Sequence, residues 1–161
     1  MKYFDYDLMT SMNNGSLSEE EIEAAERQWN NNSAIYAKTF SSLIGRLPHE
    51  VYTRFKGWGF HDYELEKLAI HHTSLLDTTI DFFLKSDSDR WKLSFFNIST
   101  FHFNHLTQDT FAPIFNRTVD SWLAEEFIVV DDHTLSFEVL FLSGANIQLT
   151  LKNKNMMLEK L

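Results

Sequence analysis

Histidines and carboxylates are the side chains with which this chain would perform acid–base or metal chemistry. It has seven histidines and 23 acidic residues. The histidines that we consider are His61-Asp62, His71-His72, His102-x-x-His105 and His133. A zinc site needs three or four ligands about 2 Å from one ion. On a strand, residues at an odd offset, such as His71 and His72, face opposite sides. We therefore expect no metal site and no cofactor.

Two carboxylates beside a tryptophan form a second candidate, in Trp122-Leu123-Ala124-Glu125-Glu126. Two carboxylates serve acid–base chemistry when their environments differ. Adjacent strand residues face opposite sides, so Glu125 and Glu126 are not expected to act on one substrate. Glu125 is expected to share a face with Leu123 and Phe127, half-buried.

A half-buried Glu125 needs a partner, for which His61, Arg90 and Arg117 are the candidates. Asp62 is expected to cap the loop around it by accepting backbone N–H groups. No residue is assigned a catalytic role. The candidate polar site consists of His61, Asp62, Trp122, Glu125 and Glu126.

Composition excludes several other functions. The chain has no cysteine, which excludes disulfides and thiol catalysis. It also lacks a G-x-S-x-G nucleophile motif and a glycine-rich phosphate-binding loop. A net charge of −9 argues against nucleic acid binding. Residues 58–161 hold fifteen acidic and eight basic residues, which favours a basic protein partner.

The elements that position these residues change character at Gly57-Trp58-Gly59. Before this point, apolar residues recur at helical spacing, and Ser18 with Glu21 has the form of a capping box. These patterns predict a short helix within residues 1–12, a helix over residues 19–43 and another over residues 49–55. The run of asparagines at residues 30–32 makes a kink plausible there.

After the glycines, apolar residues alternate in the manner of strands. We expect strands around residues 68–72, 76–84, 91–95, 123–129, 135–141 and 147–151, and a strand followed by a loop within residues 98–118. The short loops between them require antiparallel pairing. The predicted fold is α+β, with N-terminal helices packed on an antiparallel meander of five to six strands. We expect one domain over residues 1–161, helical over 1–57 and a sheet over 58–161.

Three short motifs resemble an uncharacterised bacterial family, a domain of unknown function common in Gram-positive species. They are the opening Met1-Lys2-Tyr3-Phe4, the Phe60-His61-Asp62 phrase before a strand, and Trp122-Leu123-Ala124-Glu125-Glu126 before a late hairpin. Ala124 stands where the family usually has an aromatic residue. The resemblance implies an α+β fold and a bacterial cytoplasmic setting, and it implies no catalytic residue.

The leading functional hypothesis is a non-enzymatic, cytoplasmic protein-binding or immunity-type module that binds a basic partner. One alternative is a carrier of a small apolar ligand, because fifteen phenylalanines are available to line a pocket. A metal-dependent hydrolase is the second alternative. No apolar run approaches the length of a membrane span, so we expect no membrane partner. The sequence does not predict the oligomeric state.

Overall fold

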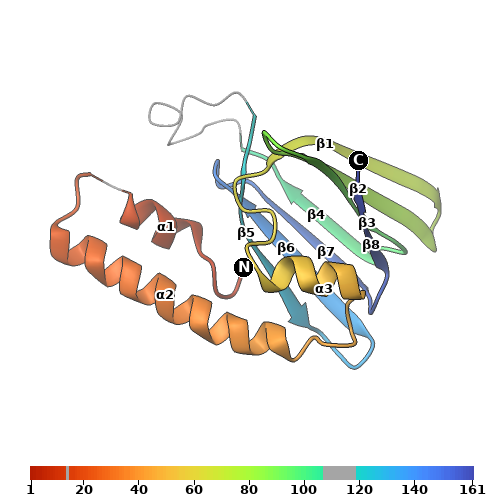
Figure 1. Ribbon diagram of the computed structural model, residues 1–161, viewed down its shortest axis with the longest axis horizontal. Coiled ribbons are helices and arrows are strands. Elements are labelled where there is room, and N and C mark those ends of the chain that lie inside the picture. The colour runs from red at the N-terminus through yellow and green to blue at the C-terminus, as the bar shows by residue number, and fades with distance from the viewer. Residues whose placement is uncertain (14, 107–118) are drawn as a thin grey trace.

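A computed structural model describes residues 1–13, 15–106 and 119–161 (Figure 1). Within these residues, three helices precede eight strands. The helices are α1 (Tyr6–Met12), α2 (Glu19–Ser41) and α3 (His49–Lys56). The strands are β1 (Glu64–Ser74), β2 (Asp77–Lys85), β3 (Arg90–Phe95), β4 (Thr100–Asn104), β5 (Trp122–Val129), β6 (Thr134–Phe141), β7 (Asn146–Lys152) and β8 (Met156–Lys160).

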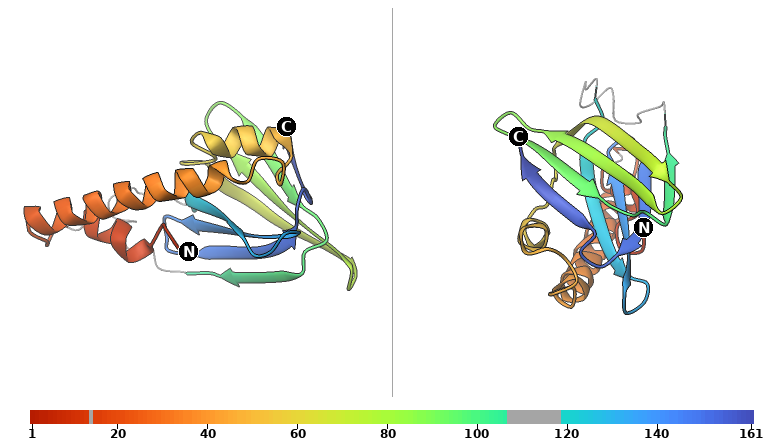
Figure 2. Two further views of the ribbon diagram at one scale, coloured as in Figure 1. Left: turned by 90° about the horizontal axis from the view of Figure 1, so that it is seen from below. Right: turned by 90° about the vertical axis from the view of Figure 1, so that its right-hand side faces the viewer.

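The strands form two four-stranded antiparallel sheets, in the orders β1-β2-β3-β8 and β4-β7-β6-β5. Among the described residues, an isolated bridge between Glu64 and Ser121 joins the start of β1 to the residue before β5. Figure 2 shows the strands around a shared interior, with α2 and α3 along one side. The α+β prediction is confirmed. The single meander of five to six strands is replaced by two sheets, because β8 returns to pair with β3 and β4 pairs with β7.

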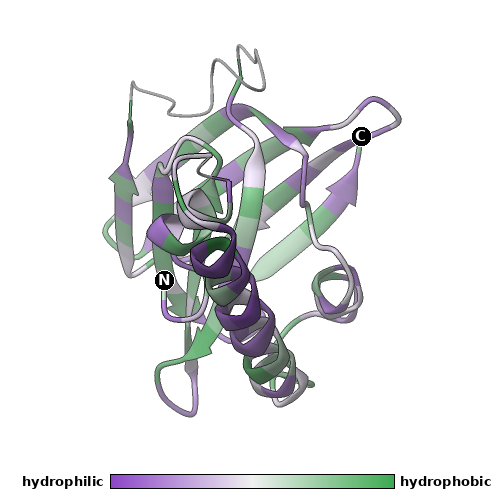
Figure 3. Cartoon of the chain, turned by 90° about the vertical axis from the view of Figure 1, so that its left-hand side faces the viewer, coloured by the Kyte–Doolittle hydropathy of each residue, from purple (hydrophilic) through white to green (hydrophobic). Residues whose placement is uncertain are grey.

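The predicted helices are present, and the expected kink in α2 is absent. Ser18 accepts the backbone N–H of Glu21 and donates its own to the Glu21 carboxylate, as the capping box predicts. Helix α2 continues through its asparagines, and Asn32 donates its side-chain amide to the carbonyl of Tyr3 at 2.9 Å instead of to its own helix backbone. Coloured by hydropathy, α2 is largely hydrophilic (Figure 3).

Aromatic rings fill the space between the sheets and α3. Phe55 of α3 has its ring centroid 5.1 Å from that of Phe127 and 5.6 Å from that of Phe60. Phe137 of β6 lies 4.7 Å from both Phe127 and Phe95. Ring pairs at these distances add attraction to the burial of their area. The phenylalanines therefore form a mutually packed core to which α3 contributes directly.

The hairpin of β1 and β2 projects from the body of the molecule (Figure 2). Its turn consists of Leu75 and Leu76, whose side chains are 91% and 87% exposed. No helix in the described part of the chain combines the length and apolar character needed to cross a membrane.

Candidate functional site

The loop of residues 57–62, here called the junction loop, is bound to the start of β5. The Asp62 backbone N–H donates to the carbonyl of Trp122 at 2.9 Å. Nδ1 of His61 lies 2.7 Å from the carbonyl oxygen of Leu123. Trp122 in turn donates its backbone N–H to the carbonyl of Tyr63 at 2.8 Å. The two sequence motifs, distant in the chain, are therefore neighbours in the fold.

A β-bulge at Leu123 determines which residues of β5 face the core. Trp122 pairs with Phe141 and Ala124 with Leu140, so two residue steps on β5 match one on β6. Trp122 and Glu125 consequently lie on the same face, with Phe127. Leu123 lies on the other face, where it packs with Met9 and Leu140. The expectation that Leu123 and Glu125 share a face was wrong, because the extra residue in a bulge interrupts the alternation of side chains between the two faces.

The Glu125 carboxyl group lies beneath Gly59 of the junction loop. A Cβ atom added to Gly59 would approach Oε1 of Glu125 to 2.5 Å. Trp122 Nε1 donates to Oε2 of Glu125 at 2.5 Å. Burial raises the pKa of Glu125 to about 7, opposed by the hydrogen bond from Trp122 and by the charge of Arg54. Glu125 thus changes charge near neutral pH.

Arg54 of α3 is the cation of this region. Its guanidinium carbon lies 4.4 Å from the ring centroid of Phe60, 5.0 Å from that of Tyr63 and 5.2 Å from that of Trp91. Its Nε is buried without a hydrogen-bond partner among the described residues. Three ring faces attract the guanidinium charge. Of the expected partners of Glu125, His61 binds the Leu123 carbonyl and Arg90 pairs with Glu66 instead. Arg117 lies outside the described residues, so its pairing with Glu125 stays a prediction.

Glu126 is separated from the other candidates because it points to the opposite face of β5. It is 1% exposed and accepts the backbone N–H groups of Lys2, Tyr3 and Phe4 at 2.8, 2.6 and 2.8 Å. The amino group of Met1 lies 2.9 Å from the carboxylate of Glu138 on the neighbouring strand. The prediction that Glu125 and Glu126 face opposite sides of β5 is confirmed. Glu126 anchors the N-terminal segment.

The surface of the junction loop carries Trp58, which the sequence did not indicate as part of the site. Trp58 is 84% exposed and its ring centroid lies 5.9 Å from that of His61. The Asp62 carboxylate is 3.6 Å from Nε2 of His61, and its side chain is 79% exposed. Among the described residues the Asp62 carboxylate accepts no backbone N–H, so its expected capping role is not seen, and its backbone N–H holds the loop instead. We call Trp58, His61 and Asp62 the junction surface.

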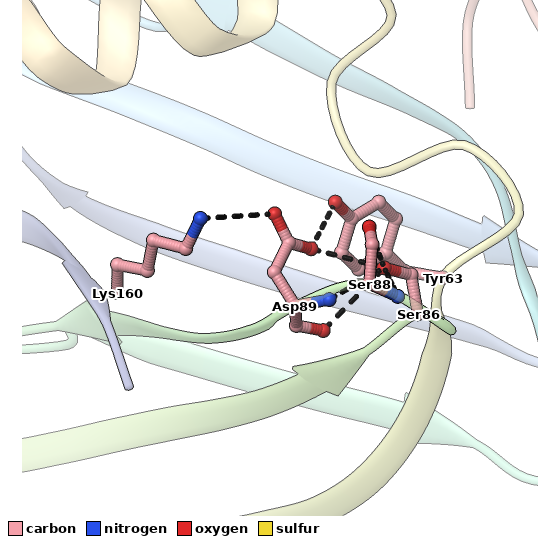
Figure 4. Close-up of polar contacts among 5 residues, drawn as sticks. All are labelled: Tyr63, Ser86, Ser88, Asp89 and Lys160. Atoms are coloured by element: carbon pink, nitrogen blue, oxygen red, sulfur yellow. Dashed lines mark hydrogen bonds and ion pairs between the residues drawn. The ribbon is translucent and has the colours of Figure 1, made fainter.

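Tyr63 connects the same region to the loop between β2 and β3 (Figure 4). Its hydroxyl donates to Asp89 at 2.6 Å, and Lys160 Nζ lies 3.5 Å from the other oxygen of that carboxylate. The hydroxyl of Ser86 donates to Asp89 at 2.9 Å. The hydrogen bond from Tyr63 is the main reason that the pKa of Asp89 falls to about 2.

Many of the acidic side chains in the strand region are paired within the fold. The pairs are Glu64 with Lys85, Glu66 with Arg90, His71 with Asp81, Lys92 with Glu159, and Lys160 with Asp89. No group of three or more histidine, aspartate or glutamate side chains placed to hold a metal ion occurs in residues 1–13, 15–106 and 119–161. The negative charge of this region is thus partly neutralised internally, and the Asp62 carboxylate, 3.6 Å from Nε2 of His61, is 79% exposed.

An open groove of about 370 Å³ lies away from the junction loop, between the N-terminal segment, α1 and α2. Its lining mixes polar residues such as Lys2, Asp5 and Asn32 with the apolar Met1 and Leu8. The groove therefore differs in character from the aromatic core.

Comparison with known proteins assigns no family to the chain. No protein-family model matches the sequence, and no curated protein sequence matches it. The resemblance to the uncharacterised bacterial family stays a prediction.

Proposed function

We propose that the chain is a cytoplasmic, non-enzymatic protein-binding module whose contact surface is the junction surface. The observation that carries this proposal is the 84% exposure of Trp58 on a loop bound to β5. Tryptophan is the residue most enriched among those that dominate binding energy at protein interfaces. A large ring on an attached loop loses little conformational freedom when a partner covers it.

The partner is a basic protein. The face of an indole ring attracts the ammonium of lysine and the guanidinium of arginine. The exposed carboxylate of Asp62 adds a negative charge on the same loop. The net charge of −9 accelerates encounter with a positively charged molecule. An immunity-type protein that masks a basic toxin surface is one form of such a module.

The arrangement of carboxylates supports binding over catalysis. Glu125 and Glu126 face opposite sides of β5, and Glu126 is occupied by three backbone N–H groups. Gly59 covers the Glu125 carboxyl group. A metal-dependent hydrolase would need three ligands to converge, and in the part of the chain that the structure describes no such group forms.

Quantitative affinity capture from the natural host cell tests the proposal. Wild type, Trp58→Ala and Leu76→Ala are compared, because Leu76 is an equally exposed apolar residue on the projecting hairpin. We expect a basic protein to be enriched by wild type and by Leu76→Ala, and to be lost with Trp58→Ala. Asp62→Asn should weaken binding of that protein and reduce its salt dependence. Equal recovery by wild type and Trp58→Ala would contradict the proposal.

The apolar-carrier alternative is supported only by the abundance of rings in the core. Those rings contact one another at centroid distances such as 4.7 Å. Native mass spectrometry of protein purified from its host distinguishes the two functions. A constant additional mass of an apolar small molecule would favour the carrier.

A further inference from the structure

Gly59 of the junction loop lies against the Glu125 carboxyl group and leaves no room for a side chain there. Gly59 has a φ of +53°, and the site of its missing Cβ lies 2.5 Å from Oε1 and 3.0 Å from Oε2 of Glu125. The backbone of the loop is therefore the cover of this carboxyl group. Two hydrogen-bond contacts fasten the loop to β5 at its bulge. His61 contacts the carbonyl of Leu123, and Asp62 donates its backbone N–H to the carbonyl of Trp122.

The charged and titratable groups around Glu125 come from several elements. Arg54 of α3 supplies the positive charge that acts on Glu125. Tyr36 of α2 feels the negative charge of Glu125 and uses its hydroxyl to accept the Phe127 N–H at 2.8 Å. On the strand itself, Trp122 donates to Glu125, and Glu126 faces away. On β6, the residue paired with Glu125 is Val139, which is apolar. The loop contributes His61 and Asp62.

We propose that Glu125 is a proton-operated latch beneath the junction loop: its protonated form holds residues 57–62 closed on β5, and its ionised form loosens them. Loosening the loop would change how Trp58 is presented, so this last step rests on the proposed function. The latch itself does not depend on any partner.

The physical reason is the cost of a buried charge. An ionised carboxylate covered by Gly59 has lost part of its hydration, and among the described residues the donor from Trp122 and the charge of Arg54 restore only some of it. Opening the cover admits water to the charge. The neutral acid carries no such cost. Because burial places the pKa of Glu125 at about 7, the change of state falls in the physiological range.

Nuclear magnetic resonance of the full chain without a partner tests the latch. Four tryptophans give four indole N–H signals, and the one that donates to Glu125 belongs to Trp122. We expect this signal and the Asp62 backbone amide to titrate with the same midpoint as the Glu125 carboxyl carbon, near pH 7. Corrected for intrinsic exchange, the Asp62 amide should be about tenfold less protected at pH 8 than at pH 6.

Two variants separate Glu125 from its neighbour. Glu125→Gln, which cannot ionise, should keep the Asp62 amide equally protected at both pH values. His61→Gln removes one fastening of the loop and should lower the protection of the Asp62 amide at both pH values. Survival of the pH dependence in Glu125→Gln overturns the latch. If Glu125→Gln does not fold, different midpoints for the Glu125 carbon and the Asp62 amide in the wild type overturn it. Failure to find a basic partner leaves these readouts unchanged and counts only against the proposed function.

Discussion

Trp122 donates its indole N–H to the carboxyl group of Glu125, three positions further along the same strand, at 2.5 Å. In a regular strand these two side chains would point to opposite faces. The bulge at Leu123 shifts the alternation of side chains by one residue, so both side chains lie on the same face beneath Gly59. One irregularity in β5 therefore pairs the indole of the buried Trp122 with the half-buried Glu125, as the sequence predicted for the burial of Glu125.

Replacing Gly59 with alanine should destabilise the protein by about 2–4 kcal/mol. The new Cβ meets the Glu125 carboxyl group and the backbone has a positive φ. Gly57→Ala is the matched control, because its nearest neighbour, the Arg54 carbonyl oxygen, would lie at 3.7 Å. Denaturant unfolding measures both. In the double variant Gly59→Ala/Glu125→Ala the effects should be less than additive, since the clashing partner is absent; strict additivity would show that the clash does not dominate.

The free energy of unfolding should fall as the pH rises from about 5 to 8. The pKa of Glu125 is about 7 in the folded state against 4.5 as its ordinary value, so between these values the folded chain binds more protons than the unfolded one. Glu125 accounts for at most about 3 kcal/mol of this fall. Urea unfolding at several pH values should show the fall in wild type and a flatter profile in Glu125→Gln. Identical profiles would exclude a raised pKa.

Loss of the Glu126 carboxylate should detach the N-terminal segment. Glu126→Ala leaves three backbone N–H groups without their acceptor, at a cost of about 3 kcal/mol. Hydrogen exchange of residues 2–4 should accelerate together. Glu23→Ala is the control, because Glu23 belongs to an exposed ion pair with Arg27 and its loss should change stability by less than about 0.5 kcal/mol. Continued slow exchange of residues 2–4 in Glu126→Ala would disprove the anchoring role.

The pKa of Asp89 should rise in Tyr63→Phe, because the hydrogen bond from Tyr63 is its main cause of depression. Lys160→Met should raise it less, since the lysine charge contributes least. Carboxyl-carbon titration measures both. A carboxyl group whose pKa is lowered in the folded state stabilises the fold at pH values above its pKa in the unfolded chain. The wild type should therefore lose this stabilisation as the pH falls from about 4 towards 2. Tyr63→Phe should lose less. An unchanged Asp89 titration in Tyr63→Phe would refute the assignment.

The sequence predicted local structure well wherever a repeat or a cap was intact. Ser18 and Glu21 fix the start of α2, and the alternation in β6 and β7 gives their faces directly. It did not predict β8, whose residues Met156–Lys160 do not alternate and which is defined by its pairing with β3. Periodicity shows which side of a strand is buried, but not which strand lies beside it.

The sequence predicted most residues of the candidate site correctly, but not the role of each one. His61, Asp62, Trp122 and Glu125 gather at the start of β5, whereas Glu126 does not. The bulge that decides this has no signature in the sequence. Trp58 was named only as part of a glycine-rich junction, because the pattern Gly57-Trp58-Gly59 is equally consistent with a buried ring. Its exposure depends on the path of the loop over Glu125.

The contacts of Glu126 also constrain the order in which the molecule assembles. Lys2 leaves the ribosome 124 residues before the carboxylate that binds its backbone. The sheet β1-β2-β3-β8 likewise cannot be completed until residues 156–160 have been synthesised. Pairings this distant in sequence form late and slowly. During synthesis the N-terminal segment therefore leaves the ribosome long before β5, the strand to which it binds.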